Sequence, residues 1–126
     1  MPLVTLTVLQ PKPRAFKDAV LNAVHSALVH VGVPPTDVFQ RVLELPAEDF
    51  RFDRTYPDVQ GSRSDDFVLV EILLSAGRSV KVKKQLLAHL VQQLQAAGHQ
   101  PEDVMVVFKE TSWENWSFAG GRQIHV

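Results

Sequence analysis

An internal repeat is the feature that most constrains what this 126-residue chain can fold into. At an offset of 66 residues, which carries Gly32 onto Gly98, apolar and turn residues of the first half recur in the second. The other matching pairs are Val4 with Val70, Val20 with Leu86, Val24 with Leu90, Leu28 with Leu94, Pro35 with Pro101, Asp37 with Asp103, Val38 with Val104 and Glu44 with Glu110. Since both copies read strand, helix, strand, they predict an α/β (α+β) fold, in which two consecutive βαβ units form a four-stranded mixed sheet with both helices on one face.

The first copy, residues 2–45, shows where its elements begin and end. Apolar and β-branched residues over 3–9 predict a strand. Pro13 suits the first turn of a helix, which apolar residues at helical spacing continue as far as Gly32. A second strand is then expected over 38–45.

The second copy, residues 67–110, repeats this order. Residues 67–74 form the strongest strand pattern in the sequence. Ser79 is a suitable N-cap for a helix over 80–97, whose apolar stripe recurs at helical spacing. A fourth strand is expected over 104–110.

The two copies and the segments around them predict a single domain over residues 1–126. The connecting loop, 46–66, is polar and contains proline, glycine and many charged residues. The C-terminal tail, 111–126, is rich in aromatic residues.

The strand over 67–74 also predicts an oligomer. Val68, Val70, Ile72 and Leu74 alternate with Phe67, Leu69, Glu71 and Leu73, so both faces of the strand are largely apolar. A strand that is apolar on both faces is typically buried on both. Two helices cover only one face, so we expect other copies of the chain to cover the second.

Composition and patterning exclude several kinds of partner and cofactor. A net charge of −1 leaves no electrostatic footprint for nucleic acid or an anionic membrane. The sequence shows no signal-peptide pattern and no apolar run of about 20 residues, so we expect a soluble, cytoplasmic protein. There is no cysteine and no phosphate-binding glycine loop, and the five histidines lie at no metal-ligand spacing. We therefore expect neither a cofactor nor a metal.

Pro2 leads directly into the first strand. If Met1 is removed, Pro2 carries a secondary amine, which can act as a base or a nucleophile. The alternative is that Pro2 is only an N-terminal residue that tolerates the loss of a backbone donor.

Several short pieces of sequence occur in a characteristic order and spacing. They are Pro2-Leu3, Gly32-Val33-Pro34-Pro35-Thr36-Asp37, Val68-Leu69-Val70, Arg78-Ser79, Pro101-Glu102-Asp103, Glu114-Asn115-Trp116-Ser117-Phe118 and Gly121-Arg122. Together they resemble the tautomerase superfamily, and most closely its malonate semialdehyde decarboxylase-like branch. The resemblance implies repeated βαβ units, a catalytic N-terminal proline and assembly as a trimer.

The resemblance also implies a role for each matching residue. Pro2 matches the catalytic proline, and Asp37 matches an aspartate that positions or activates a water or partner group. Arg78 matches the second of two arginines in the decarboxylase. Trp116 and Phe118 match aromatic residues that wall the substrate pocket.

The sequence departs from the family pattern at two places. The position of the first arginine is held by Ala76, and Ile124-His125 stands where the family has a further aromatic residue. Lys12, the repeat equivalent of Arg78, and Arg122 are the candidates to replace the missing arginine.

Elementary chemistry supports some of these roles more than others. Arg78 lies between the end of a strand and the start of a helix, where an anion is favoured, although a loop arginine is also commonly solvated. Asp37 is either catalytic or only a turn residue. Its repeat partner Asp103 supports the second alternative, because it indicates that the turn itself favours an aspartate. Trp116 and Phe118 either line a pocket or pack on the core.

The function expected from these features is keto–enol tautomerisation of a small 2-oxo acid or related carbonyl acid, with Pro2 as acid and base. One alternative is a malonate semialdehyde decarboxylase or hydratase-type activity. An alternative of another class is a non-catalytic, ferredoxin-like module that binds a small molecule or a protein.

Overall fold

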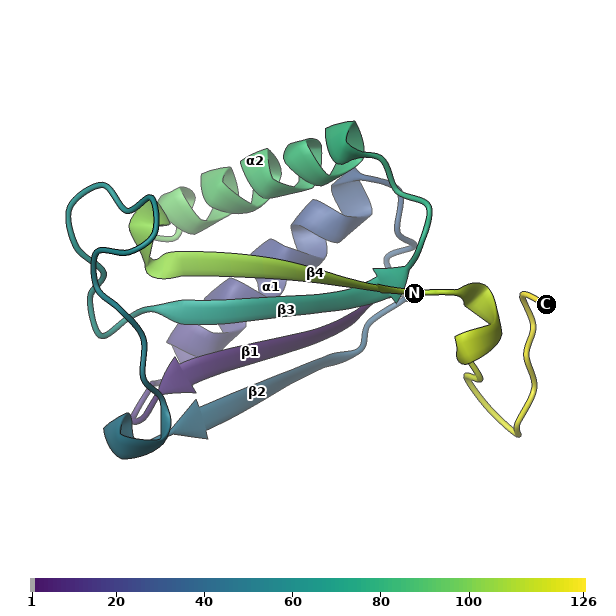
Figure 1. The fold of residues 1–126 in the computed structure, drawn as a ribbon, viewed down its shortest axis with the longest axis horizontal. Helices are drawn as coiled ribbons and strands as arrows, with labels where there is room; N and C mark the ends of the chain where they lie inside the picture. Colours follow the sequence, from purple (N-terminus) through teal and green to yellow (C-terminus); the bar gives the residue numbers. More distant parts are fainter. Residues whose placement is uncertain (1) are drawn as a thin grey trace.

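The computed structural model describes residues 2–126, so the predicted removal of Met1 lies outside the described residues. Four strands form one sheet in the order β2-β1-β3-β4, and two helices cover one of its faces (Figure 1). The strands are β1 (Leu3–Leu9), β2 (Gln40–Leu45), β3 (Val68–Ser75) and β4 (Val104–Thr111), the helices are α1 (Arg14–His30) and α2 (Val80–Ala96), and the 3₁₀ turns are η1 (Ala47–Asp49), η2 (Pro101–Asp103) and η3 (Trp113–Asn115).

The pairing of the strands confirms the predicted fold class. Strands β1 and β2 are parallel, as are β3 and β4, whereas the central pair β1 and β3 is antiparallel. The carboxyl ends of β3 and β4 therefore lie at the end of the sheet where β1 begins (Figure 1). This end also carries the C-terminal tail.

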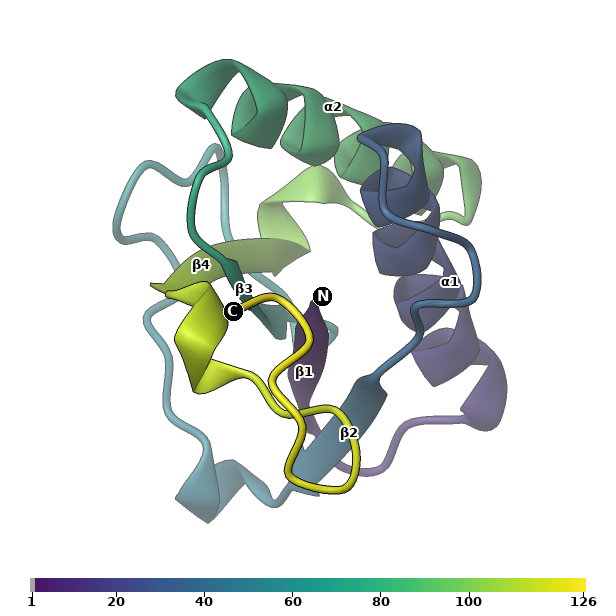
Figure 2. The ribbon, with the colours of Figure 1, turned by 90° about the vertical axis from the view of Figure 1, so that its right-hand side faces the viewer.

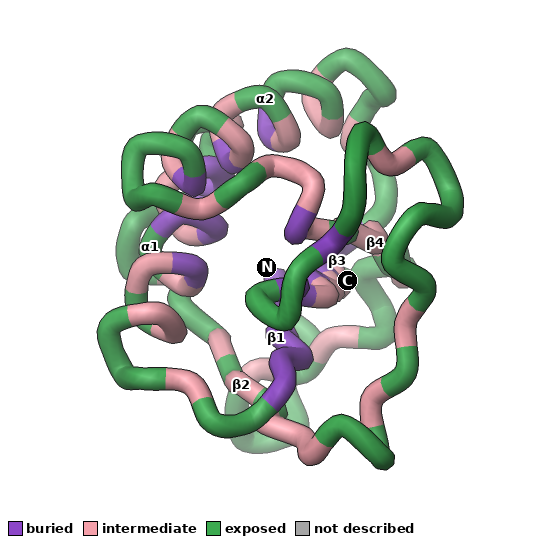
Figure 3. The backbone as a smooth tube through the Cα atoms, turned by 90° about the vertical axis from the view of Figure 1, so that its left-hand side faces the viewer, coloured by how far each residue is buried: buried purple, intermediate pink, exposed green. Residues whose placement is uncertain are grey.

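The core lies between the sheet and the two helices. Alternate residues of β1 and β3 point into it, because successive side chains of a strand face opposite sides of the sheet. Each helix contributes one apolar stripe, and Figure 3 shows that buried segments are concentrated in the strands and on one side of each helix. The fully buried large side chains include Leu6, Val70, Ile72, Val24, Leu28, Leu86 and Leu90.

The repetition continues past residues 45 and 110. Helices α1 and α2 begin and end at the same offset of 66 residues, and so do η1 and η3. Hydrogen bonds recur too: Gln10 N to Leu45 O and Ala76 N to Thr111 O are both 2.9 Å, and Lys17 pairs with Glu44 as Lys83 pairs with Glu110. The beginning of the connecting loop is thus the structural counterpart of the beginning of the tail.

Two predicted strand starts were wrong by one or two residues. The strand predicted over 38–45 begins at Gln40, because the Val38 N–H donates to the Thr36 carbonyl at 3.1 Å and closes a turn. The strand predicted to begin at Phe67 begins at Val68, because the Phe67 N–H donates to Ser64 O at 3.2 Å instead.

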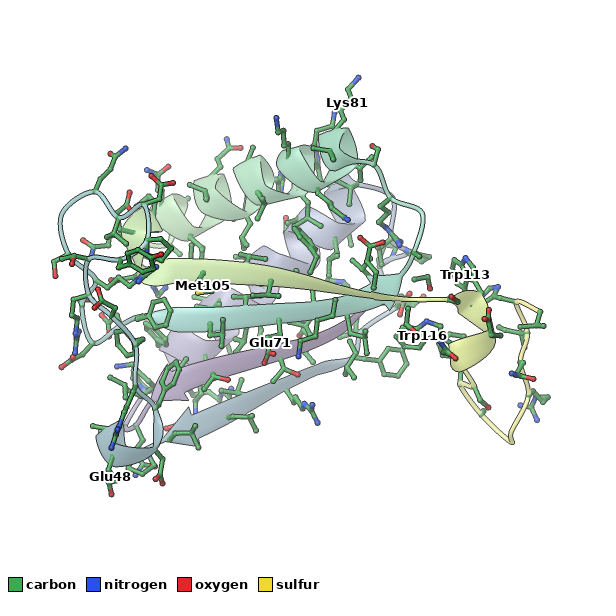
Figure 4. All side chains as sticks on the ribbon, in the orientation of Figure 1. Glu48, Glu71, Lys81, Met105, Trp113 and Trp116 are labelled. Atoms are coloured by element: carbon green, nitrogen blue, oxygen red, sulfur yellow. The ribbon has the colours of Figure 1, made fainter. Side chains whose placement is uncertain are left out.

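The sheet face opposite the helices, here called the open face, is covered only in part. Leu69 and Leu73 are half-buried on it, whereas Leu43 and Met105 are exposed. Glu71, visible on this face in Figure 4, pairs with Lys109. None of the helices in residues 2–126 is long and apolar enough to cross a membrane.

The connecting loop is anchored to the sheet by Asp103. Its buried carboxylate accepts hydrogen bonds from Ser64 N at 2.7 Å and from Ser64 Oγ at 2.6 Å. A carboxylate that is buried and doubly bonded in this way stabilises the fold, because its loss leaves both donors without their acceptor.

We therefore expect Asp103→Ala to lower the free energy of unfolding by about 1–3 kcal/mol, measured by urea denaturation. The matched control is Asp65→Ala, which removes an exposed carboxylate of the same loop that pairs with Arg54. This change is expected to cost less than about 1 kcal/mol. Equal losses in the two variants would contradict the anchoring role of Asp103.

Candidate active site

A hollow of about 210 Å³ opens at the end of the sheet where β1 begins. Its walls come from three segments that are distant in sequence: the start of β1, the residue before β2, and the tail after β4. The lining residues are Pro2, Leu3, Phe39, Trp116, Ser117 and Phe118, and this space is called the Pro2 hollow below. Figure 2 shows the tail running across this end of the sheet, in front of the strands.

The backbone explains why these segments meet. The Val4 N–H donates to the Phe39 carbonyl at 2.9 Å, which holds Phe39 beside the start of β1. Strand β4 ends next to β3, and η3 then turns the chain so that Trp116 faces the same end of the sheet (Figure 4). Within the tail, the bridge between Ala119 and Arg122 closes a turn.

Aromatic rings form one side of the Pro2 hollow. Trp116 and Phe118 are stacked, with ring centroids 5.7 Å apart and an interplanar angle of 19°. His125 lies edge-on to Phe118 at 5.9 Å and contacts Trp113 at 4.4 Å. A histidine ring therefore supports the aromatic wall near the position where the sequence departs from the family pattern.

Asp37 lies in a second hollow, of about 310 Å³, together with Pro34, Thr36, Phe39, Phe118 and Ile124. The two hollows share Phe39 and Phe118, so they are neighbours. Asp103 has a different environment from its repeat partner, because Asp103 holds the connecting loop through Ser64.

Arg78 lies near the same end of the sheet but lines neither hollow. Its Nη1 donates to the Ser75 carbonyl at 3.2 Å. The pKa of the Glu110 carboxyl is lowered, first by the hydrogen bond from Lys83 and to a smaller extent by the charge of Arg78. The guanidinium is therefore bonded to the end of β3, and its charge acts on the Glu110 carboxyl of β4.

The two candidate replacements for the missing arginine lie at opposite ends of the sheet. Lys12 follows the carboxyl end of β1, where it bonds Asp65 O at 2.9 Å and pairs with Asp66 at 3.1 Å. Because β1 runs away from the Pro2 end, Lys12 cannot reach the Pro2 hollow of its own chain. Arg122 belongs to the tail at the Pro2 end, where its guanidinium packs against Gly120.

Sequence reasoning did not single out Phe39 or His125 as site residues. Phe39 could have been identified from the sequence, because it is a large apolar residue at the start of a predicted strand. In the structure it is 54% exposed. His125 could not have been identified in this way, because only the fold brings its ring against Phe118.

The walls of the Pro2 hollow are mainly apolar, with Ser117 the polar side chain among them. Over residues 2–126, no group of three or more His, Cys, Asp or Glu side chains is arranged to hold a metal ion.

Comparison with known proteins identifies the family. Residues 37–119 match the family model described as tautomerase enzyme. The chain belongs to the tautomerase family. This match covers more than half of the chain, and it confirms the resemblance drawn from the sequence.

Solved structures of tautomerase-family proteins agree with this assignment. A malonate semialdehyde decarboxylase inhibited by 3-bromopropiolate has a TM-score of 0.87 at 26% identity, over 98% of this chain and 93% of that chain. A malonate semialdehyde decarboxylase described with decarboxylase and hydratase activities has a TM-score of 0.86 at 29% identity, over 96% and 93% of the two chains. A fused 4-OT that forms a symmetric trimer has a TM-score of 0.73 at 29% identity, over 95% and 94%.

Proposed function

We propose that this tautomerase-family chain, once Met1 is removed, uses the Pro2 amine as acid and base on a small 2-oxo acid or related carbonyl acid. Keto–enol tautomerisation is the reaction that we favour. The observation that carries the proposal is the Pro2 hollow itself, in which Pro2 shares one apolar space with Trp116 and Phe118.

The chemistry follows from the surroundings of the amine. A free α-amine has a pKa of about 8, and apolar walls disfavour its protonated form. We therefore expect the Pro2 amine to be neutral in a large fraction of molecules near pH 7. The neutral amine takes a proton from the carbon next to the carbonyl, which leaves an enolate, and the resulting ammonium returns a proton to the oxygen.

The direction of the strand supports a role for Asp37. Successive backbone nitrogens of a strand point to alternate sides. The Val4 nitrogen bonds Phe39 O on the β2 side, so the Pro2 nitrogen, two residues earlier, is directed to the same side. Asp37 belongs to the turn on that side, where its carboxylate is suited to position a water or a substrate hydroxyl.

Arg78 is the proposed carboxylate ligand. A guanidinium binds a carboxylate through two parallel hydrogen bonds, and the start of α2 adds a favourable dipole. In the described conformation one of its nitrogens bonds the Ser75 carbonyl. The proposed role therefore requires the side chain to turn toward the Pro2 hollow when substrate binds. The role of Arg78 is thus to orient the substrate rather than to transfer the proton.

Replacement of Pro2 tests the proposal. Pro2→Ala is expected to lower kcat for ketonisation of phenylenolpyruvate by about 10²–10⁴-fold, because the secondary amine held by the proline ring is replaced by a primary amine that is free to rotate. Intact-mass measurement of the untagged wild type should show that Met1 is absent. A retained Met1, or wild-type rates in Pro2→Ala, would refute the mechanism.

Arg78→Ala is the matched variant, since it removes a binding group and leaves the amine. It is expected to raise KM more than it lowers kcat.

Trapping with an aldehyde acid and cyanoborohydride should label Pro2. Labelling confined to lysines would favour the alternative of a non-catalytic binding module.

Malonate semialdehyde decarboxylase or hydratase-type activity is the second candidate, and the two similar decarboxylase structures favour it. Decarboxylation of a 3-oxo acid requires one group to hold the carboxylate and another to stabilise charge on the neighbouring carbonyl. Ala76 removes one of the two arginines that the resemblance assigns to these tasks, and Lys12 lies at the other end of the sheet.

We therefore expect wild-type decarboxylation to be weak beside tautomerisation, and Ala76→Arg to raise decarboxylation by at least about tenfold more than tautomerisation. Both reactions are assayed side by side on the same preparations. Arg122→Ala is the companion variant, because it reveals whether the tail arginine already serves as the second cation. Efficient decarboxylation by the wild type, unaffected by Arg122→Ala, would show that neither arginine is needed.

We also propose that the chain forms a homo-oligomer, a trimer by analogy with the fused 4-OT, through the open face. This face leaves Leu43 44% exposed and Met105 42% exposed. Burial of such side chains favours association.

Light scattering should give a mass three times that of the 14.1 kDa chain. Leu43→Lys is expected to lower the mass, because it puts a charge into the interface. Val80→Lys is the matched control, since Val80 is exposed at the start of α2, outside the open face. A monomeric wild type would refute the assembly.

A further inference from the structure

The repeat brings a second pair of aromatic rings into the same structural context as the rings of the Pro2 hollow. At the offset of 66 residues, Phe50 corresponds to Trp116 and Phe52 to Phe118. Each pair follows a 3₁₀ turn. This turn begins two residues after the end of β2 in the first copy and two residues after the end of β4 in the second. Figure 4 shows Glu48 of η1 and Trp113 of η3 at opposite ends of the sheet.

The other residues of the Pro2 hollow have counterparts at the far end as well. Pro2 corresponds to Val68, Leu3 to Leu69 and Phe39 to Met105. Since the bounds of the helices and turns and the register of the parallel strand pairs recur at the same offset, the chain holds two copies of one arrangement. The copy at the Pro2 end has a hollow of about 210 Å³ beside its aromatic pair.

Phe67 fills the second copy. Its ring centroid lies 4.3 Å from that of Phe52 and 5.9 Å from that of Phe50, and the side chain is only 2% exposed. The guanidinium of Arg63 covers the ring at 5.0 Å and is itself held by the carbonyls of Asp53 and Tyr56. The ring is therefore fixed from both sides.

Asp66, the residue before Phe67, contacts the cation of the second copy. Lys12 stands at the repeat position of Arg78, and the Asp66 carboxylate pairs with it at 3.1 Å. The Asp66–Phe67 segment thus presents a carboxylate to the cation and a ring to the aromatic pair.

We propose that Asp66–Phe67 is a tethered occupant that closes a second, latent copy of the Pro2 hollow, and that this latent site takes an aromatic ring of the size of benzene. The inference rests on the packing of Phe67 and not on the chemistry of Pro2, so it stands or falls separately from the proposed function. It follows that the repeat encodes this arrangement twice, and that Phe67 fills the copy at the far end.

The test removes the ring and supplies another. Phe67→Ala should leave an apolar cavity walled by Phe50 and Phe52, and such cavities stay dry and bind benzene. With benzene at about ten times its dissociation constant, we expect the Tm of Phe67→Ala to rise by about 5 °C. Amide NMR shifts should move at Phe50, Phe52 and Val68.

Phe108→Ala is the matched control, because it deletes the same side chain from β4, where the ring contacts Lys83 outside the aromatic set. Benzene should move no shifts around Phe50 in this control or in the wild type. If Phe67→Ala does not fold, Phe67→Leu keeps most of the apolar volume and should show a smaller rise at the same residues. A rise no larger than that of the control, or shifts confined to Trp116 and Phe118, would overturn the proposal.

Discussion

The antiparallel pairing of β1 with β3 is the constraint on which the rest of this structure depends. Each βαβ unit alone buries one helix against two parallel strands and leaves an edge that needs a partner. Joining the units through β1 and β3 builds a continuous core under both helices. It also sets the start of β1 beside the carboxyl ends of β3 and β4, and so brings Pro2 to the tail.

The two copies of the repeat have the same backbone elements, but the side chains at their ends have different roles. At the far end, Asp103 holds the connecting loop and Phe67 fills the space between aromatic rings. At the Pro2 end, Asp37, the counterpart of Asp103, and Trp116, the counterpart of Phe50, line neighbouring hollows. A carboxylate or an aromatic ring at a given place in this fold can therefore serve the core at one end and a site at the other.

Much of the fold was predictable, because it follows from local pattern. The helices α1 and α2 were predicted from the spacing of apolar residues and from boundary residues such as Ser79 and Gly32, and the repeat predicted the parallel strand pairs. The start of β2 was misjudged because the turn after Pro34 takes up the Val38 N–H, and β-branched composition does not reveal this. Among the site residues, Pro2, Trp116 and Phe118 were assigned to the site through the resemblance, because no local pattern brings them together and their common hollow depends on the sheet order.

The sequence by itself determined the elements, their repetition and the kinds of residue at each end, since these depend on contacts between near neighbours along the chain. Only the tertiary structure decided which ends meet. It separated Lys12 from the Pro2 hollow, set His125 against Phe118, and turned Arg78 toward the Ser75 carbonyl. The physical reason is that strand direction fixes the end of the sheet at which a side chain lies, and strand direction is a property of long-range pairing rather than of any local pattern.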